Sequence, residues 1–253
     1  MNTKTVYSTK AEKYAKYRWD YAPEAIEAII KITRMTNRSI LADLGAGTGI
    51  LTRHFVNRAR KVYAIEPNAE LRQILARDIA DFPSVSVVDV SAEDTRLSDQ
   101  SVDVITVAQA IHWFDPEPAR EEMMRILKPG GWLALLRNYG TNQEHNDTIG
   151  SLMKEEYGAD FTSSNERPQE KPIHFYFGNN DFYKLTFSFQ FKQNWEEFIG
   201  ALTTASYMPD EEHPLFRKLK AKAKEVFSKF SKEGYWTVEG ETELIIGQPS
   251  RNG

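Results

Sequence analysis

A glycine loop is the part of this sequence whose residue types and spacing point most directly to chemistry. The run Asp43-Leu44-Gly45-Ala46-Gly47-Thr48-Gly49 follows an apolar stretch that begins at Ser39. Glycines at alternate positions let the backbone turn tightly, so its N–H groups can approach a ligand at the start of the next helix. The sequence therefore predicts a binding site for a nucleotide-type cofactor, with Gly45, Ala46 and Gly47 among its contacts.

The surroundings of the loop bear on which nucleotide-type cofactor it holds. A dinucleotide fingerprint expects a third glycine where this chain has Ile50. A second predicted strand, Val62 to Ile65, leads into Glu66 and Pro67. An acid at this place accepts hydrogen bonds from ribose hydroxyls, a contact that NAD and S-adenosylmethionine share. The loop and Glu66 by themselves leave both cofactors open.

Three further segments follow later in the chain. They are Ala92-Glu93-Asp94, then Ala108-Gln109-Ala110-Ile111-His112-Trp113-Phe114, and then Leu127-Lys128-Pro129-Gly130-Gly131. Together with the loop and Glu66, in this order, they closely resemble the class I S-adenosylmethionine-dependent methyltransferases. The resemblance is to the type-11 group that includes trans-aconitate methyltransferase-like enzymes. It covers residues 7 to 137 and, weakly, the C-terminal end.

This resemblance implies cofactor contacts residue by residue. Asp43 would order the loop and reach the methionine ammonium, while Glu66 and Pro67 would lie at the ribose. Ala92 and Glu93 would contact adenine, with Asp94 as the alternative acid. The predicted cofactor site also includes Ala108, Gln109, Tyr14 and Arg18, the last two matching a Tyr-x-x-x-Arg arrangement that folds over the cofactor.

His112 and Trp113 are the predicted catalytic residues, because the resemblance places this pair beside the transferring methyl group. Packing is the competing interpretation, since a lone His or Trp more often packs or donates a hydrogen bond than catalyses. In-line methyl transfer needs mainly alignment of the nucleophile with the S–CH₃ bond. A carboxylate acceptor arrives ionised, whereas a phenol benefits from a base such as His112.

The elements that must position these residues alternate between short β-rich runs and helical periodicity. This alternation predicts an α/β fold, a Rossmann-like, doubly wound, seven-stranded and mostly parallel sheet that binds ligands at the carboxyl ends of its strands. The predicted core strands are 39–44, 61–65, 85–89, 102–108 and 132–137, and the helices between them are 50–58, 68–80 and 117–127.

We expect one methyltransferase domain over residues 1–253, with a core at 34–137. The resemblance implies that two C-terminal strands, at 183–191 and 241–248, complete the sheet. It also implies an inserted, mainly helical lid from three segments: residues 1–33, 138–182 and 194–236.

Composition and charge exclude several classes of partner. The chain has 253 residues and a formal net charge of −4, which gives no global attraction to nucleic acid or to an anionic membrane. The segment Ala108-Gln109-Ala110 also lacks the Asn/Asp-Pro-Pro-aromatic turn of enzymes that methylate amino groups of nucleic acids. The sequence holds no cysteine, no run long enough to span a membrane and no apolar signal core, so a cytoplasmic enzyme is expected.

The function expected from these observations is S-adenosylmethionine-dependent methyl transfer to a small molecule, with S-adenosylhomocysteine as product. Oxygen, as carboxylate or hydroxyl, is the favoured acceptor atom. No metal is expected, because the five histidines are scattered. Three alternatives stay open: carboxyl methylation of an acyl chain on a carrier protein, a non-catalytic S-adenosylmethionine-binding module, and an NAD-dependent dehydrogenase.

Overall fold

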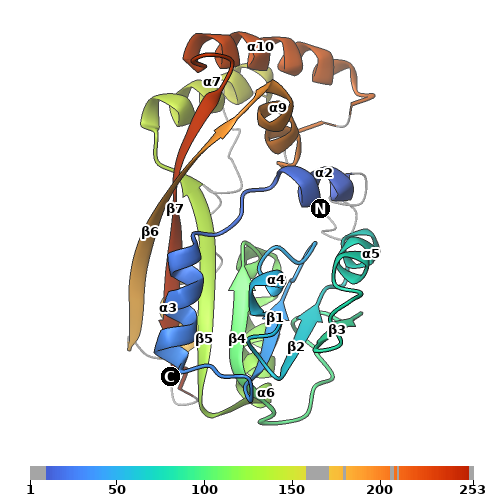
Figure 1. Ribbon diagram of the computed structural model, residues 1–253, viewed down its shortest axis with the longest axis vertical. Helices are drawn as coiled ribbons and strands as arrows, with labels where there is room; N and C mark the ends of the chain where they lie inside the picture. Colours follow the sequence, from blue (N-terminus) through green and yellow to red (C-terminus); the bar gives the residue numbers. More distant parts are fainter. Residues whose placement is uncertain (1–9, 158–170, 179–180, 206–207, 210, 251–253) are drawn as a thin grey trace.

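A seven-stranded sheet forms the centre of the molecule (Figure 1). The computed structural model describes residues 10–157, 171–178, 181–205, 208–209 and 211–250. The strands lie in the order β3-β2-β1-β4-β5-β7-β6, and β7 runs in the opposite direction to the other six. Their bounds are β1 Ile40–Leu44, β2 Lys61–Ile65, β3 Val85–Val88, β4 Val102–Ala108, β5 Leu127–Gly140, β6 Phe182–Gln193 and β7 Trp236–Gly247.

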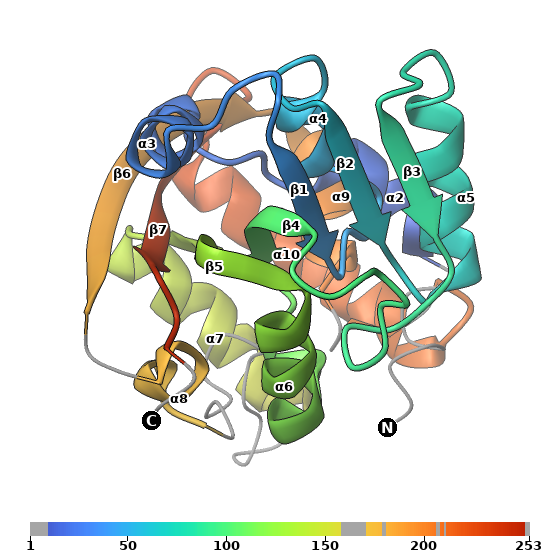
Figure 2. The same cartoon turned by 90° about the horizontal axis from the view of Figure 1, so that it is seen from below.

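Helices cover both faces of this sheet (Figure 2). On one face, Ile26 and Ile29 recur on the same side of α3 and are buried against the strands, next to Phe55 of α4. On the other face, Met123 of α6 and Phe177 of α8 are buried. These helices are α3 Pro23–Thr33, α4 Thr52–Phe55, α5 Ala69–Asp78, α6 Pro116–Ile126 and α8 Ile173–Phe177. The doubly wound α/β fold expected from the sequence is confirmed.

A helical cap stands on one end of the sheet (Figure 1). Strands β5, β6 and β7 have 14, 12 and 12 residues, whereas β4 has 7, so these three extend past the parallel strands. Helices α7 Gln143–Tyr157, α9 Trp195–Thr203 and α10 Pro214–Phe230 gather on this extension. Met153, Phe198 and Phe227 of these helices are buried against Trp236 and Val238 of β7. We call these three helices and the strand ends beneath them the cap.

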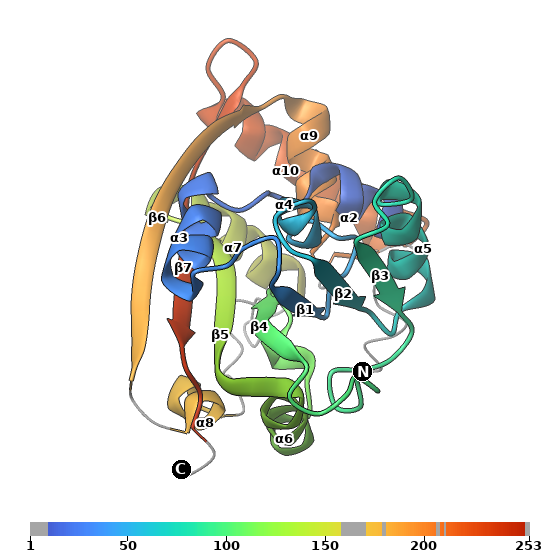
Figure 3. The same cartoon turned by 60° about the horizontal axis from the view of Figure 1, so that its bottom comes forward.

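Helix α2, Ala11–Tyr17, joins the cap to the sheet's helices (Figure 3). It contacts α5 on one side and α9 on the other. The Tyr17 hydroxyl donates to Glu196 Oε1 of α9 at 2.7 Å, and Ala11 is buried against Leu71 of α5. The N-terminal segment therefore crosses above the carboxyl ends of β1 and β2, where the sequence predicts the ligand.

The lid differs in part from its predicted extent. Residues 23–33 form α3, which packs on the sheet, and α8 in the predicted segment 138–182 packs beside α6 at the far end from the cap. Residues 1–9 and 158–170 of the predicted lid lie outside the described residues. The part of the lid that lies over the strand ends is therefore α2, the chain after it, and the cap.

Two predicted elements of the core have different lengths in the structure. The helix expected at 50–58 is the single turn of α4, and the strand expected at 132–137 is part of the longer β5. The pairing of β5 with β4 changes register between Val102 and Val104, and this change accommodates the glycine turn before Trp132. Within the described residues, no helix is both long and apolar enough to cross a membrane.

Candidate functional site

Two cavities lie at the carboxyl ends of the parallel strands. The smaller has a volume of about 230 Å³ and lies between the glycine loop, Glu66 and the segments that follow β3 and β4. The larger has a volume of about 600 Å³ and lies under the cap, between α7, α9, the ends of β5 and β7, and residues 17–21. We call them the loop cavity and the cap cavity. Gln109 lines both, so the two cavities meet at this residue.

The glycine loop forms one wall of the loop cavity. Gly45 and Gly47 have φ values of 68° and 58°, which residues other than glycine rarely adopt. A Cβ at Gly45 would lie 2.6 Å from Ala110 Cβ, whereas a Cβ at Gly47 would meet no described atom within 4 Å. Gly47 therefore leaves space for a ligand, and the loop is fixed to β2 by the bond from Ala46 N to Ile65 O (2.9 Å).

Glu66 is held in the loop cavity by the backbone on both sides. Its Oε2 accepts a hydrogen bond from Gly47 N and its Oε1 accepts one from Asn68 N, each at 2.8 Å. Burial raises the pKa of Glu66, while these two N–H bonds favour the charged form. Each carboxylate oxygen has a second lone pair. The fixed carboxylate can therefore accept bonds from two neighbouring hydroxyls, as the ribose prediction requires.

Asp43 lies behind the loop instead of on a cavity wall. Its Oδ1 accepts from Thr106 Oγ1 at 2.8 Å and its Oδ2 accepts from Thr52 Oγ1 at 2.6 Å. Burial raises the pKa of Asp43 to about 6. The carboxyl ties β1 to β4 and α4, and Asp43 is not among the described residues that line either cavity. Its direct contact with a cofactor stays a prediction.

The predicted adenine residues meet at the other side of the loop cavity. Ala92 and Glu93 line it, together with Pro67 and Ala108. Glu93 Oε1 accepts a hydrogen bond from Asp115 N at 2.9 Å, which fixes the side chain at the start of α6. The alternative acid, Asp94, is paired with Arg96 at 3.8 Å and is exposed. Of the two acids, the geometry favours Glu93 for a flat base with an exocyclic amine.

The two predicted catalytic residues, His112 and Trp113, differ in their relation to the cavities. Ile111–Trp113 forms the short helix η2, and the rings of His112 and Trp113 lie 4.9 Å apart. Trp113 lines the loop cavity, whereas His112 is not among the described residues that line either cavity. Their direct role in catalysis stays a prediction.

Gln109 joins the two cavities in a strained conformation. Its φ of 55° is in the left-handed region, which costs a residue with a side chain about 1 kcal/mol or more. Gln109 N donates to Leu136 O at 2.9 Å, and its Nε2 donates to Asn138 O at 3.0 Å. Asn138 in turn donates to Asp20 O at 2.9 Å. The chain after α2 is thereby tied to the junction of the cavities.

Tyr14 and Arg18 lie on opposite sides of this junction. Tyr14 lines the loop cavity and Arg18 lines the cap cavity, with the guanidinium 5.5 Å from the centre of the Tyr14 ring. The two residues therefore border different cavities, and contact of either with a cofactor stays a prediction.

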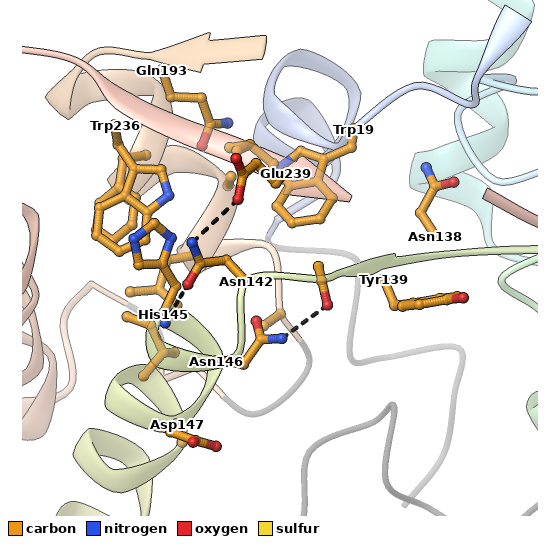
Figure 4. Close-up of a pocket in the computed structure, with 18 of the residues that line it drawn as sticks. Trp19, Asn138, Tyr139, Asn142, His145, Asn146, Asp147, Gln193, Trp236 and Glu239 are labelled. Carbon is orange, nitrogen blue, oxygen red and sulfur yellow. Dashed lines mark hydrogen bonds between the residues drawn. The ribbon is translucent and has the colours of Figure 1, made fainter. Parts of the chain in front are cut away.

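Several cap-cavity residues were not predicted from the sequence. Asn142, His145 and Gly150 come from α7 or the turn before it, whereas Trp236 and Glu239 come from β7 (Figure 4). The His145 ring lies 4.1 Å from the Trp236 ring, and burial lowers the pKa of His145. These two segments are far apart in the sequence, so no local signal links them.

The loop cavity has the side chains and the space that an adenosyl group requires. The buried carboxylate of Glu66 suits ribose hydroxyls, Ala92 and Leu71 give apolar walls for the base, and the space at Gly47 admits the ligand.

No group of three or more His, Asp or Glu side chains among residues 10–157, 171–178 and the described part of 181–250 could hold a metal ion.

Comparison with known proteins agrees with this geometry. Residues 42–135 match a family described as "Methyltransferase domain". An uncharacterised methyltransferase of Mycobacterium tuberculosis is 42% identical over 125 residues, 49% of each chain. A protein of Saccharomyces cerevisiae named as an S-adenosylmethionine-dependent methyltransferase is 28% identical over 138 residues, 52% of this chain and 47% of its own.

A solved structure extends the likeness to the whole fold. A proposed type II methyltransferase from Anaeromyxobacter dehalogenans superposes with a TM-score of 0.65 at 19% identity, over 92% of this chain and all of its own. The chain spans about half the length of the curated relatives it matches. Residues 42–135 therefore match the methyltransferase-domain family, and the chain has the same fold as this solved methyltransferase.

Proposed function

We propose that this protein is a methyltransferase that transfers the methyl group of S-adenosylmethionine to a small molecule bound in the cap cavity. The observation that carries the proposal is the junction at Gln109, where a ligand in the loop cavity and a second ligand in the cap cavity would meet. The name of the S. cerevisiae relative supports the choice of cofactor.

The chain's own residues would bind and orient the cofactor. Glu66 would accept hydrogen bonds from the ribose, Glu93 would face the adenine amine, and the N–H groups and open space of the loop at Gly47 would lie along the ligand. Tyr14 would close the cavity from α2. Trp113 would offer an aromatic face near the sulfonium, which suits a cationic methyl group.

The chemistry that the cofactor supplies when bound is a methyl group on a positively charged sulfur, an activated leaving group. The acceptor oxygen would take this methyl group, and a hydroxyl acceptor would release its proton to water. Alignment of the oxygen with the S–CH₃ bond at about 3–3.5 Å is the enzyme's main task. Gln109 and Asn138, linked to each other, would hold the acceptor at this point.

Two tyrosines of the cap cavity, Tyr21 and Tyr139, do not supply an ionised base near neutral pH. Burial raises the pKa of Tyr21 well above its usual value. The hydrogen bond that Tyr139 donates to Glu241 raises its pKa as well. An ionised base for a hydroxyl acceptor would therefore come from another side chain of the wall and not from these two tyrosines.

Two measurements test the proposal in sequence. Calorimetric titration should show binding of S-adenosylmethionine and S-adenosylhomocysteine but not of NADH. Incubation with methyl-labelled S-adenosylmethionine and fractionated cell extract should then label a small-molecule fraction. Binding of NADH alone would overturn the proposal in favour of a dehydrogenase. Cofactor binding without methyl transfer to any fraction would overturn it in favour of a binding module.

A further inference from the structure

We propose that the acceptor is an uncharged molecule with a planar, hydroxylated ring system, bound lengthwise in the cap cavity, and not a small polycarboxylate. This inference rests on the proposed methyl transfer and narrows its acceptor. Four features of the cap cavity carry it: size, charge balance, the kinds of side chain on its wall, and the structure of its far end.

The size of the cap cavity exceeds what a small acid needs. Its volume of about 600 Å³ lies in the range of pockets that enclose drug-sized ligands, about 300–1,000 Å³. Figure 4 shows Asn138 at one end, Trp19 in the middle, and His145 with Trp236 at the other end. An acceptor whose reactive atom lies beside Gln109 can therefore extend along this line to the cap.

The charges on the cavity wall cancel. Arg18 and Lys154 are the cationic side chains among the described lining residues, and Asp147 and Glu239 are the anionic ones. Burial lowers the pKa of His145 and thereby favours its neutral form. A tricarboxylate would need an excess of cations to replace its hydration, because burial of unpaired charge costs several kcal/mol. The described lining residues offer no such excess, so they favour an uncharged ligand.

Aromatic and amide side chains supply most of the remaining wall. Aromatic faces stack on planar rings, and amides both donate to and accept from hydroxyl groups. The aromatic side chains are Tyr17, Trp19, Tyr21, Tyr139, Phe198 and Trp236. The amide side chains are Gln109, Asn138, Asn142, Gln143, Asn146 and Gln193. This combination is suited to a flat molecule with hydroxyls on its edge.

The far end of the cavity is a fixed polar and aromatic surface. Asn142 Nδ2 donates to Glu239 Oε2 at 3.3 Å, and Asn142 Oδ1 accepts from His145 N at 3.1 Å (Figure 4). The His145 ring lies against the rings of Trp236 and Phe230, at 4.1 and 4.7 Å. Each side chain is thus held in place before a ligand arrives, and a fixed surface costs less ordering entropy on binding.

Gly150 offers a way to fill the cavity without disturbing its wall. It lies on α7 and lines the cap cavity, and a Cβ added there meets no described atom within 4 Å. Gly150→Phe should therefore place an aromatic ring where the acceptor's ring is proposed to lie. Glu144→Phe adds the same side chain to α7 at an exposed position outside the cavity lining and serves as the matched control.

The test is calorimetric titration of the protein saturated with S-adenosylhomocysteine. Resveratrol, naringenin and 2-naphthol are the uncharged ring probes, and citrate and trans-aconitate are the tricarboxylate probes. We expect at least one ring probe to bind with a dissociation constant on the order of 10 µM. Its affinity should fall by about tenfold or more in Gly150→Phe and stay within about threefold in Glu144→Phe. The tricarboxylates should show no saturable binding.

Three results would overturn the inference: no binding of any ring probe, saturable binding of a tricarboxylate, or equal ring-probe affinity in wild type and Gly150→Phe. A separate titration with S-adenosylhomocysteine distinguishes this failure from failure of the proposed function. If S-adenosylhomocysteine binds and the ring probes do not, the acceptor class is wrong and the cofactor assignment stands. If S-adenosylhomocysteine itself does not bind, the proposed function fails first.

Discussion

Replacement of Glu66 gives the sharpest prediction for the loop cavity. Glu66→Ala removes the acceptor of two backbone N–H bonds of 2.8 Å and the proposed acceptor of the ribose hydroxyls. Loss of hydrogen bonds to a charged group typically costs about 1.5–3 kcal/mol. We therefore expect the affinity for S-adenosylhomocysteine to fall by about 10-fold to 150-fold. The two orphaned N–H groups, Gly47 and Asn68, should also lower the free energy of unfolding by about 1–3 kcal/mol.

The isosteric variant separates these two effects. Glu66→Gln keeps one oxygen that can accept from a backbone N–H or from a ribose hydroxyl, but its amide nitrogen cannot accept. Its affinity should therefore lie between those of wild type and Glu66→Ala. Burial raises the pKa of Glu66, so wild-type affinity should decline as acidic pH protonates the carboxyl, whereas Glu66→Gln should show no such decline.

The assay is isothermal titration with S-adenosylhomocysteine from pH 5 to pH 8, with thermal unfolding of each variant as the folding control. Asp94→Ala is the matched control, because Asp94 is an exposed acid outside the lining of the loop cavity. It should leave the affinity within about twofold. Affinity in a folded Glu66→Ala variant that equals that of Asp94→Ala would refute the placement of the ribose at Glu66.

Three other substitutions test separate parts of the structure. Gly150→Ala should raise the free energy of unfolding by about 0.5–1 kcal/mol in urea titrations, because the methyl group enters open space on a helix; a loss of stability would contradict that. Gln109→Gly should keep or raise stability by relieving its left-handed φ, yet lower methyl transfer by about tenfold; full activity would remove Gln109 from the junction. For Asp43, the folded pKa of about 6 exceeds the unfolded value of 3.8, so stability should fall as pH rises from about 4 to 6. Asp43→Asn should abolish that slope in unfolding experiments, and an unchanged slope would contradict burial as its cause.

Most of the predicted cofactor residues line one cavity because they are local to strand ends. The glycine loop follows β1 directly, and Glu66, Ala92 and Ala108 each lie at or near the end of a strand whose apolar pattern is clear. Parallel strands bring such ends to one edge of the sheet. The alternation of strands and helices therefore sufficed to place these residues together.

The sequence did not predict the cap cavity because its walls depend on long strands and distant segments. The predicted strand 241–248 missed the first residues of β7, including Trp236 and Glu239. Gly240 interrupts the alternating pattern there, and a Cβ at that position would lie 2.5 Å from the Phe189 ring of β6. A glycine that suggests a loop in the sequence is favoured in the structure because the Phe189 ring of the paired strand lies over it.

Measuring methyl transfer in the cavity-filling variant is the most direct test of the account. Wild type, Gly150→Phe and Glu144→Phe would be incubated with methyl-labelled S-adenosylmethionine and the extract fraction that wild type labels. We predict that Gly150→Phe loses transfer by about tenfold or more while its affinity for S-adenosylhomocysteine stays within about threefold, and that Glu144→Phe matches wild type. Undiminished transfer by a folded Gly150→Phe variant would contradict the claim that the acceptor is bound in the cap cavity and meets the cofactor at Gln109.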